Sequence, residues 1–120
     1  MYGEKMNVTF ELPWPPTSNT YWRRNGGRYF ISKRGIEYRE HVYKSCRIYK
    51  GLFDSSDKIT VDIKAFPPDK RKRDLDNLFK SLLDSFQYCG IYKDDCQIDK
   101  LSIERMYDNI GKIIVKIETI

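Results

Sequence analysis

Apolar and polar residues alternate in four stretches of the chain, and each alternation predicts a β-strand with one buried face. Pro13, Pro15 and Pro16 follow the first stretch and predict its end, because proline has no backbone N–H to donate to a sheet. A turn at residues 109–111 separates the last two stretches. The four stretches are residues 8–12, 59–65, 101–107 and 113–117.

Two further segments have the spacing of amphipathic helices. Ser32 is suited to cap a helix that runs to about Tyr49, with Gly51 as a stop signal just beyond it. The second helix starts at about Leu75 and ends at Gly90, where a left-handed cap is expected. The residues expected to face the core are Ile36, Val42, Tyr43 and Cys46 in the first helix, and Leu75, Leu78, Phe79, Leu82, Leu83 and Phe86 in the second.

Residues 21–30 predict a β-hairpin, because Asn25-Gly26 tolerates the positive φ of a tight turn and aromatic residues flank it. The order of elements is then strand, hairpin, helix, strand, helix, strand, strand. This order predicts an α+β (mixed α/β) fold, with a mixed sheet and two main helices in a single small domain over residues 1–120.

Composition narrows the class of protein. The 120 residues are 40% hydrophobic and 32% charged, which suits one globular domain and is unlike a disordered chain. No run approaches the roughly 18 apolar residues of a membrane span. Cys46, Cys89 and Cys96 cannot all pair and lack the spacing of a zinc site, so we expect a reduced cytoplasmic protein that does not contact a membrane.

Charged residues are distributed unevenly. Residues 23–50 hold nine bases and two acids, and residues 70–73 are four consecutive bases. Residues 74–100 reverse the sign, with six acids and three bases. A basic surface around a small acidic centre suits a nuclease, because Lys and Arg neutralise phosphates while carboxylates hold a divalent metal. Charge alone leaves an ordinary solvated basic face equally open.

Asp74 and Asp76 lie two residues apart where a loop meets the second helix, so both carboxylates can point at one spot. An isolated pair of this kind more often serves the helix itself, with Asp74 as the N-cap and Asp76 as a first-turn acid that complements the helix dipole. Lys80 follows Asp76 by four residues, which is also the spacing of an ordinary surface ion pair.

A second acidic pair, Asp94 and Asp95, follows the second helix. That helix is roughly 22 Å long at 1.5 Å per residue, so Asp95 approaches Asp74 only if the loop folds back along the helix or two subunits face each other. Carboxylate oxygens suit Mg²⁺ or Mn²⁺. The single histidine, His41, is far from these acids in the sequence, which favours metal-bound water over an imidazole base.

The ordered combination of motifs resembles the RusA family of Holliday junction resolvases, and the match runs from about Leu12 to Gln97. Where the family often has paired Asn after the prolines, this chain has Ser18-Asn19, which leaves the role of that loop less certain. The matching motifs are Leu12-Pro13-Trp14-Pro15-Pro16, Ser18-Asn19, Tyr21-Trp22, the basic run into Arg73-Asp74-Leu75-Asp76-Asn77-Leu78, Lys80, Asp84, Gly90, Asp94-Asp95 and Gln97.

The resemblance implies a bacterial or phage-associated homodimeric endonuclease for DNA recombination and repair. It would bind four-way junction DNA and nick two opposed strands symmetrically with Mg²⁺, for which Mn²⁺ could substitute. The family's catalytic and metal-binding acids carry over to Asp74, Asp76 and Asp95, and its essential lysine to Lys80, which would stabilise charge in the transition state. Supporting roles fall to Asn77, Asp84 and Asp94.

Two groups of basic residues are expected to contact DNA, one in the run before the acids and one in the hairpin. The run matches the family in character only. Aromatic residues of the hairpin could stack on opened bases, although packing on the sheet or at a dimer interface is the favoured interpretation. The basic residues are Lys70, Arg71, Lys72 and Arg73 in the run, and Arg23, Arg24 and Arg28 in the hairpin; the aromatic residues are Trp22, Tyr29 and Phe30.

Two alternative functions stay open from the sequence. The first is a nuclease with broader specificity, for branched DNA in general, which would use the same acids. The second is a module that binds junctions without cutting them. The presence of every acid and of the lysine argues against the binding module but does not exclude it.

Overall fold

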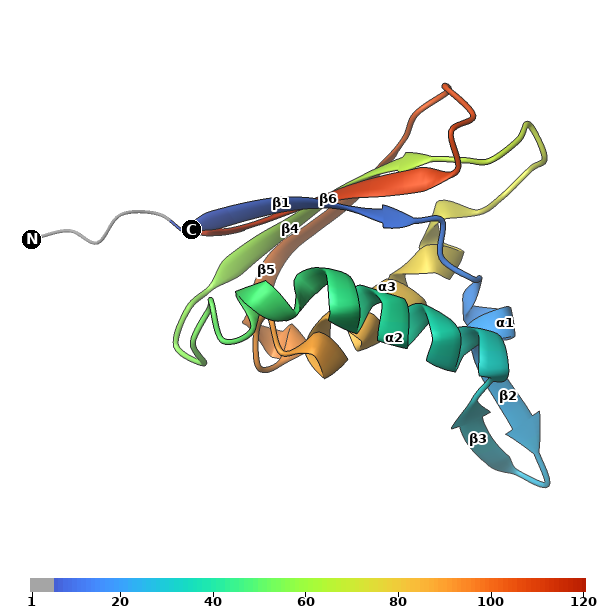
Figure 1. Ribbon diagram of the computed structural model, residues 1–120, viewed down its shortest axis with the longest axis horizontal. Helices are drawn as coiled ribbons and strands as arrows, with labels where there is room; N and C mark the ends of the chain where they lie inside the picture. Colours follow the sequence, from blue (N-terminus) through green and yellow to red (C-terminus); the bar gives the residue numbers. More distant parts are fainter. Residues whose placement is uncertain (1–5) are drawn as a thin grey trace, which may run out of the picture.

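The computed structural model describes residues 6–120, so the first five residues of the predicted domain lie outside the described part. A four-stranded mixed sheet carries helices on one face (Figure 1). A two-stranded hairpin extends from the helical layer, away from the sheet. The elements are β1 (Asn7–Pro13), α1 (Ser18–Tyr21), β2 (Trp22–Asn25), β3 (Arg28–Ile31), α2 (Lys33–Cys46), η1 (Arg47–Tyr49), β4 (Ile59–Phe66), η2 (Leu75–Leu78), α3 (Phe79–Cys89), η3 (Asp95–Gln97), β5 (Ile98–Arg105) and β6 (Lys112–Thr119).

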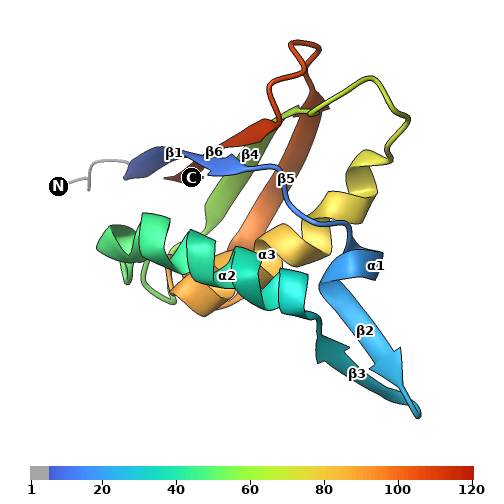
Figure 2. The same cartoon turned by 45° about the vertical axis from the view of Figure 1, so that its right-hand side comes forward.

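The sheet confirms the predicted mixed α+β class and explains the position of α3. Its strand order is β1-β6-β4-β5, with β6 antiparallel to both β1 and β4, and with β4 parallel to β5. Parallel strands cannot be joined by a tight turn, so the chain crosses over between β4 and β5 through α3. That crossover lays α3 and α2 side by side on one face of the sheet (Figures 1 and 2).

The core lies between this face and the two helices. Val61 and Val115 from the sheet are fully buried, as are Val42 of α2 and Phe86 of α3. Phe86 packs edge-on against Phe10 of β1, with ring centroids 5.8 Å apart. The alternation of strand residues therefore places apolar side chains inside and polar ones outside, as the sequence pattern predicts.

Helix α2 begins as predicted but turns a different face inward. The Ser32 hydroxyl caps it by accepting a hydrogen bond from the Gly35 N–H at 3.0 Å. The predicted core position Ile36 is 44% exposed, whereas Tyr38 is buried in its place. The reason is Gly35, which packs directly on the Tyr21 carbonyl and so turns the next residue, Ile36, outward.

The second predicted helix is α-helical only from Phe79. Its first turn is the 3₁₀ segment η2, where the Asn77 carbonyl accepts a hydrogen bond from the Ser18 hydroxyl at 2.8 Å. Just before η2, the Arg105 guanidinium donates to the Arg73 carbonyl at 2.5 Å. These contacts with other parts of the chain hold the segment in place. At the far end, Gly90 adopts the predicted left-handed cap with φ of 82°.

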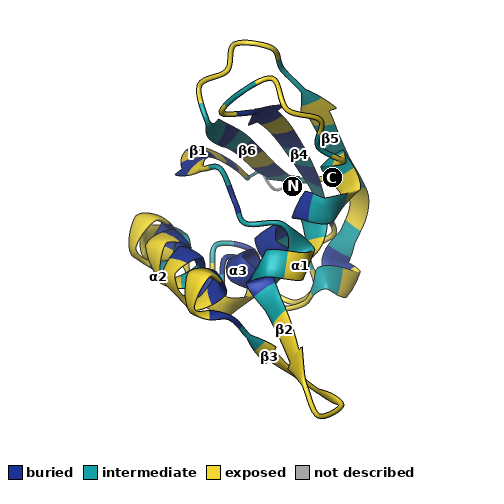
Figure 3. Ribbon diagram, turned by 90° about the vertical axis from the view of Figure 1, so that its right-hand side faces the viewer, coloured by how far each residue is buried: buried dark blue, intermediate teal, exposed yellow. Residues whose placement is uncertain are grey.

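The β2–β3 hairpin forms, but its turn and its packing differ from expectation. The positive φ values fall on Gly26 and Gly27, so the turn is centred one residue later than Asn25-Gly26. Tyr29 is 71% exposed and Phe30 is 47% exposed. The hairpin points away from the body of the molecule (Figure 3). The predicted packing on the sheet is therefore wrong for these two residues.

Smaller differences concern the third strand and the cysteines. Strand β5 runs over Ile98–Arg105, so it starts earlier than predicted and excludes Tyr107, which is exposed in the following loop. Cys46 and Cys89 are buried, whereas Cys96 is exposed. Within residues 6–120, no helix is long and apolar enough to cross a membrane.

Substitution of Gly35 by Ala is expected to destabilise the protein by about 1–3 kcal/mol. An added Cβ would lie 2.7 Å from the Tyr21 carbonyl oxygen and 2.8 Å from Cγ1 of Ile31, and the carbonyl belongs to backbone that cannot move away. In an ordinary helix interior the same change stabilises by roughly 1 kcal/mol. The sign of the change in the free energy of unfolding therefore tests the close contact of Gly35. Urea denaturation measures the effect, with Ser45→Ala on the exposed side of α2 as the control, expected within about 0.5 kcal/mol of wild type.

Candidate active site

A groove of about 1000 Å³ runs over the outward face of α3, between α2 and the hairpin on one side and η3 on the other. It brings together two predicted site residues of α3 and one of η3, with aromatic and basic neighbours that the sequence analysis did not place there. The residues that matter below are Trp22, Tyr29, Arg39, Lys80, Asp84 and Asp95.

The periodicity of α3 places Lys80 and Asp84 in this groove. Leu82 and Phe86 are fully buried against the sheet, so residues on the opposite side of the helix face solvent. Lys80 and Asp84 lie one turn apart on that side. They do not form an ion pair with each other, and Asp84 interacts with Arg39 of α2 instead.

Asp84 is held by neighbours from two other helices. The Tyr21 hydroxyl donates a hydrogen bond to Oδ2 of Asp84, and Nη1 of Arg39 lies 3.7 Å from the same oxygen. The Arg39 guanidinium also lies over the Tyr88 ring, 4.2 Å from its centroid. Asp84 thus holds a cation at the groove, and its supporting role stays a prediction.

Asp95 enters the groove because the chain folds back after α3. Its Oδ1 accepts a hydrogen bond from the Tyr92 hydroxyl at 2.8 Å. Burial raises the pKa of the Asp95 carboxyl, the hydrogen bond from Tyr92 lowers it, and the charges of Asp94 and Asp84 raise it again. The net pKa is raised, and Asp84 lines the same groove.

Gln97 fixes the fold-back and is a positioning residue whose role the sequence did not reveal. Its side-chain oxygen accepts from the backbone N–H groups of Lys93 and Asp94 at 2.9 and 3.0 Å. Its side-chain nitrogen donates to the carbonyls of Asp54 and Asp57 at 2.7 and 3.0 Å. Asp94 completes a capping box as the N-cap of η3, so it shapes the loop rather than lining the groove.

Asp74 and Asp76 lie at the start of η2, and both are exposed. Asp74 occupies the N-cap position, but its side chain accepts no capping hydrogen bond. Asp76 forms no ion pair with Lys80 among the described residues. The side-chain cap by Asp74 and the ion pair between Asp76 and Lys80 are therefore not supported, whereas Asp76 does lie in the first turn of η2, as its structural interpretation expects. All three side chains are exposed.

The predicted metal ligands do not form one cluster within the described residues of a single chain. Across residues 6–120, no three His, Cys, Asp or Glu side chains come together as a metal-binding group. Asp95 shares the groove with Asp84, while Asp74 and Asp76 lie beyond it at η2. The donors still suit Mg²⁺, which commonly binds through one or two carboxylates and completes its shell with water and substrate phosphates.

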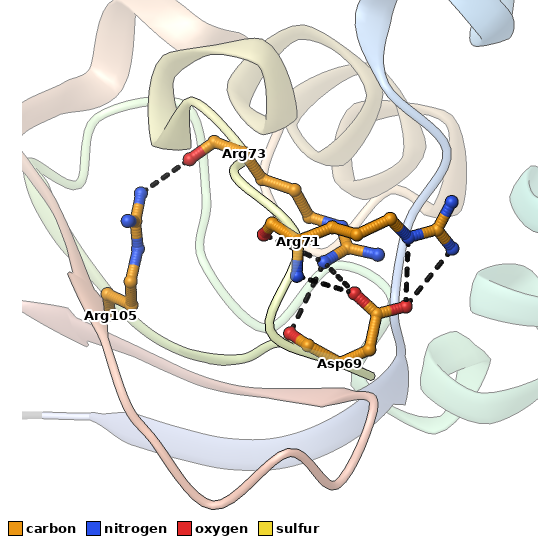
Figure 4. Close-up of polar contacts among 4 residues, drawn as sticks. All are labelled: Asp69, Arg71, Arg73 and Arg105. Carbon is orange, nitrogen blue, oxygen red and sulfur yellow. Dashed lines mark hydrogen bonds and ion pairs between the residues drawn. The ribbon is translucent and has the colours of Figure 1, made fainter.

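The basic run before the acids is organised by Asp69 (Figure 4). Nη1 of Arg73 and Nη2 of Arg71 lie 2.7 and 3.0 Å from its carboxylate oxygens. The hydrogen bonds from Arg73 and Arg71 hold the pKa of Asp69 well below its usual range, and the one from Arg73 has the larger effect. The Arg73 side chain is only 19% exposed and lies against Trp14, whereas that of Arg71 is 81% exposed.

Other predicted DNA contacts are more open. Lys70 and Lys72 are exposed, as are Arg23, Arg24 and Arg28 on the hairpin. None of the five forms an ion pair with any residue that the structure describes. His41 is also exposed and does not line the groove, which agrees with its exclusion as a catalytic base.

Two serine hydroxyls attach the proline-rich loop to the site. Ser18 donates to the Asn77 carbonyl at 2.8 Å, and Ser81 donates to the Pro16 carbonyl at 3.0 Å. The uncertain role of Ser18-Asn19 is thereby clarified, since Ser18 joins the loop to the acidic segment. Ser81 is fully buried in α3; a polar residue within an otherwise apolar helix face was the signal that could have found this contact.

Comparison with known proteins identifies close relatives. The family described as endodeoxyribonuclease RusA matches residues 13–118. The protein named crossover junction endodeoxyribonuclease rusA from Enterobacteria phage HK97 is 43% identical over 96 residues, which is 80% of each chain. Proteins of the same name from Shigella sonnei and Escherichia coli strain K12 are 38% and 37% identical over 98 residues, 79% of each chain.

Substitution Asp95→Asn is expected to leave the free energy of unfolding at pH 7.5 equal to or above that of wild type. The raised pKa of Asp95 means that the folded state binds the proton more tightly than the unfolded chain, so stability is lost as the pH rises through the folded pKa. Asn removes that ionisation. Urea denaturation at pH 7.5 and pH 4.5 measures the difference, which should shrink at the lower pH.

Tyr92→Phe is the matched variant, because it removes only the hydrogen-bond donor to Asp95. It should lower the free energy of unfolding by about 1 kcal/mol at pH 7.5 and by less at pH 4.5. A loss above about 1 kcal/mol for Asp95→Asn would instead show that the carboxylate is a structural element of the loop.

Proposed function

The chain belongs to the RusA endodeoxyribonuclease family, and on this premise we propose that it resolves four-way DNA junctions by paired, symmetric nicks during recombination and repair. The observation that carries the proposal is the similarity, over about four fifths of the chain, to proteins named crossover junction endodeoxyribonuclease. The exposed acids, the exposed Lys80 and the basic segments support it physically. The relatives come from bacteria and a phage, which fits the cytoplasmic location expected from the sequence.

Asp74, Asp76 and Asp95 are the residues that we propose to hold a divalent ion, Mg²⁺ with Mn²⁺ as a substitute. Such an ion, when bound, polarises the scissile phosphate and lowers the pKa of its water. Asp74 and Asp76 are exposed, and in the described part of the chain neither forms an ion pair and Asp74 makes no capping hydrogen bond, which leaves their oxygens available for this role. Asp84 and Asn77 act on the protein side, by holding Arg39 and by anchoring the loop at Ser18.

Lys80 has the electrostatic role. Its ammonium lies in the groove with no ion pair among residues 6–120, so its charge is not neutralised before substrate arrives. A fixed cation beside the reacting phosphate stabilises the charge that develops on the phosphorane or on the leaving oxygen. Arg39, held over Tyr88, adds a second cation to the same groove.

A homodimer follows from the two cuts that the proposed reaction requires. A two-fold symmetric pair places identical sites on a junction that is itself nearly two-fold symmetric. Dimerisation also offers a way to bring Asp74 and Asp76 of one subunit towards Asp95 of the other. The separation of these acids within one chain supports this arrangement.

The two alternatives make different demands. A nuclease for branched DNA in general would use the same acids and lysine. A binding module without cleavage has no need of exposed Asp74, Asp76 and Lys80 that form no ion pair within residues 6–120, so their state favours an enzyme.

Substitution Asp74→Asn is expected to reduce cleavage of a four-way junction by at least about 100-fold while binding is unchanged or tighter. The neutral side chain cannot hold the metal, and a negative charge near the phosphates is removed. The assay compares a synthetic junction with a linear duplex and a flap of equal length, with Mg²⁺ and with EDTA. Paired nicks restricted to the junction are expected for wild type, and EDTA should abolish them.

Asp108→Asn is the control, since Asp108 is an exposed acid in the loop before β6. It should cut like wild type. Collapse of binding in Asp74→Asn would show that this carboxylate is structural, and equal cutting of all three substrates would favour the broader nuclease. Tight binding by wild type without cutting in any metal would favour the binding module.

Replacement of Lys70 and Lys72 by Ala is expected to weaken junction binding and to lower the slope of log K against log salt by roughly 2. Both side chains are exposed and form no ion pair with the residues that the structure describes, unlike Arg73, which Asp69 and Trp14 hold. The double variant Lys64→Ala/Lys116→Ala removes the same charge from the outer face of the sheet, and its slope should change by less than about 0.5. Equal slopes for the two double variants would contradict a DNA contact by the basic run.

A further inference from the structure

The β2–β3 hairpin exposes aromatic surface that the fold of the chain does not use. Tyr29 and Phe30 are among the large hydrophobic residues left exposed, at 71% and 47%. The hairpin leaves the helical layer as a separate two-stranded ribbon (Figures 2 and 3). An exposed aromatic surface of this kind on a projecting element is typical of a binding site.

The register of the hairpin divides its side chains between two faces. Trp22 pairs with Ile31, and Arg24 pairs with Tyr29, so these four residues share one face of the ribbon. Arg23 pairs with Phe30 on the other face. The face with Trp22 and Tyr29 is the one that lines the groove, which Lys80 and Asp95 also line.

Charge identifies the class of ligand. Residues 22–31 include Arg23, Arg24 and Arg28 and no acid. The Arg24 guanidinium lies 5.6 Å from the centroid of the Tyr29 ring, so a cation accompanies the aromatic face that borders the groove. Such a surface attracts a polyanion and repels a second copy of the same hairpin, which favours nucleic acid over self-association through this ribbon.

Stacking adds a condition on the shape of the DNA. The bases of an intact duplex are stacked on both faces and offer none to a side chain, whereas a base exposed at a branch point offers a free π-face. An aromatic ring at the rim of a groove that also holds Lys80 would therefore contact DNA only where the helix is interrupted near the cleavage site.

We propose that Tyr29, with Trp22 beside it, stacks on a DNA base that is unpaired at the branch point, while Arg24 contacts an adjacent phosphate. This inference rests on the proposed function, because it assigns to the hairpin the selection of branched over linear DNA at the same groove. Tyr29 is thus a specificity residue that positions the substrate, and Lys80 remains the residue that acts on the reacting phosphate.

The test measures binding of a four-way junction and of a linear duplex of equal length in EDTA, so that no cleavage intervenes. Tyr29→Ala should weaken junction binding by about 5- to 100-fold, the range expected for loss of one stacked base, and leave duplex binding within about twofold. Tyr29→Phe keeps the ring and should bind like wild type. Phe30→Ala, on the opposite face, is the matched aromatic control and should retain junction affinity.

A junction with 2-aminopurine at the branch point gives a second readout. Wild type and Tyr29→Phe should change its fluorescence on binding, and Tyr29→Ala should not. If Tyr29→Ala loses affinity equally for junction and duplex, or keeps its junction affinity, the inference is overturned. The proposed function still stands in either case, provided that wild type binds the junction. If sedimentation shows wild type as a dimer and Tyr29→Ala as a monomer, Tyr29 belongs to a subunit interface and the inference is overturned. If wild type binds no junction, the proposed function fails, and this inference fails with it.

Discussion

Burial of one face of α3 against the sheet determines where the candidate site lies. The parallel pairing of β4 and β5 requires a crossover, and the crossover helix must cover the sheet. Leu82 and Phe86 are fully buried in that contact and contribute about 1.5–3 kcal/mol each. Lys80 and Asp84 are consequently held on the outer side of a rigid helix, where the groove is. A substitution that rotated α3 would move Lys80 and Asp84 relative to Asp95, which lies on η3.

The other walls of the groove depend on polar contacts that join distant parts of the chain. Gln97 ties the loop after α3 to the backbone at Asp54 and Asp57, and this brings Asp95 beside Asp84. Ser18 and Ser81 hold the proline-rich loop against η2 and α3. Each of these side chains satisfies backbone groups, so hydrogen bonds fix the loops around the site together with the burial of Ile91 and Tyr92 in the core.

The errors of prediction have separate physical causes. Ile36 was expected inside because helical periodicity gives the spacing of a buried face but not its exact rotation, and the close approach of Gly35 to Tyr21 sets that rotation. Packing of Tyr29 and Phe30 on the sheet is wrong because their hairpin pairs only with itself and both side chains are exposed, while packing at a dimer interface stays a prediction. The same exposure is what makes the hairpin a candidate for contact with DNA.

The sequence by itself determined the approximate positions of the strands and the helix caps at Ser32 and Gly90, because these depend on residue type and on local spacing. The candidate acids and Lys80 were selected by the resemblance to a family, because their spacing alone left structural interpretations open. Only the tertiary structure decided which of them meet. Asp95 joins Lys80 and Asp84, and Arg39 arrives from another helix, while Asp74 and Asp76 stay apart from the groove. The physical reason is that such meetings depend on how the chain folds back after α3 and on which helix faces the sheet, and both are set by contacts between residues far apart in the sequence.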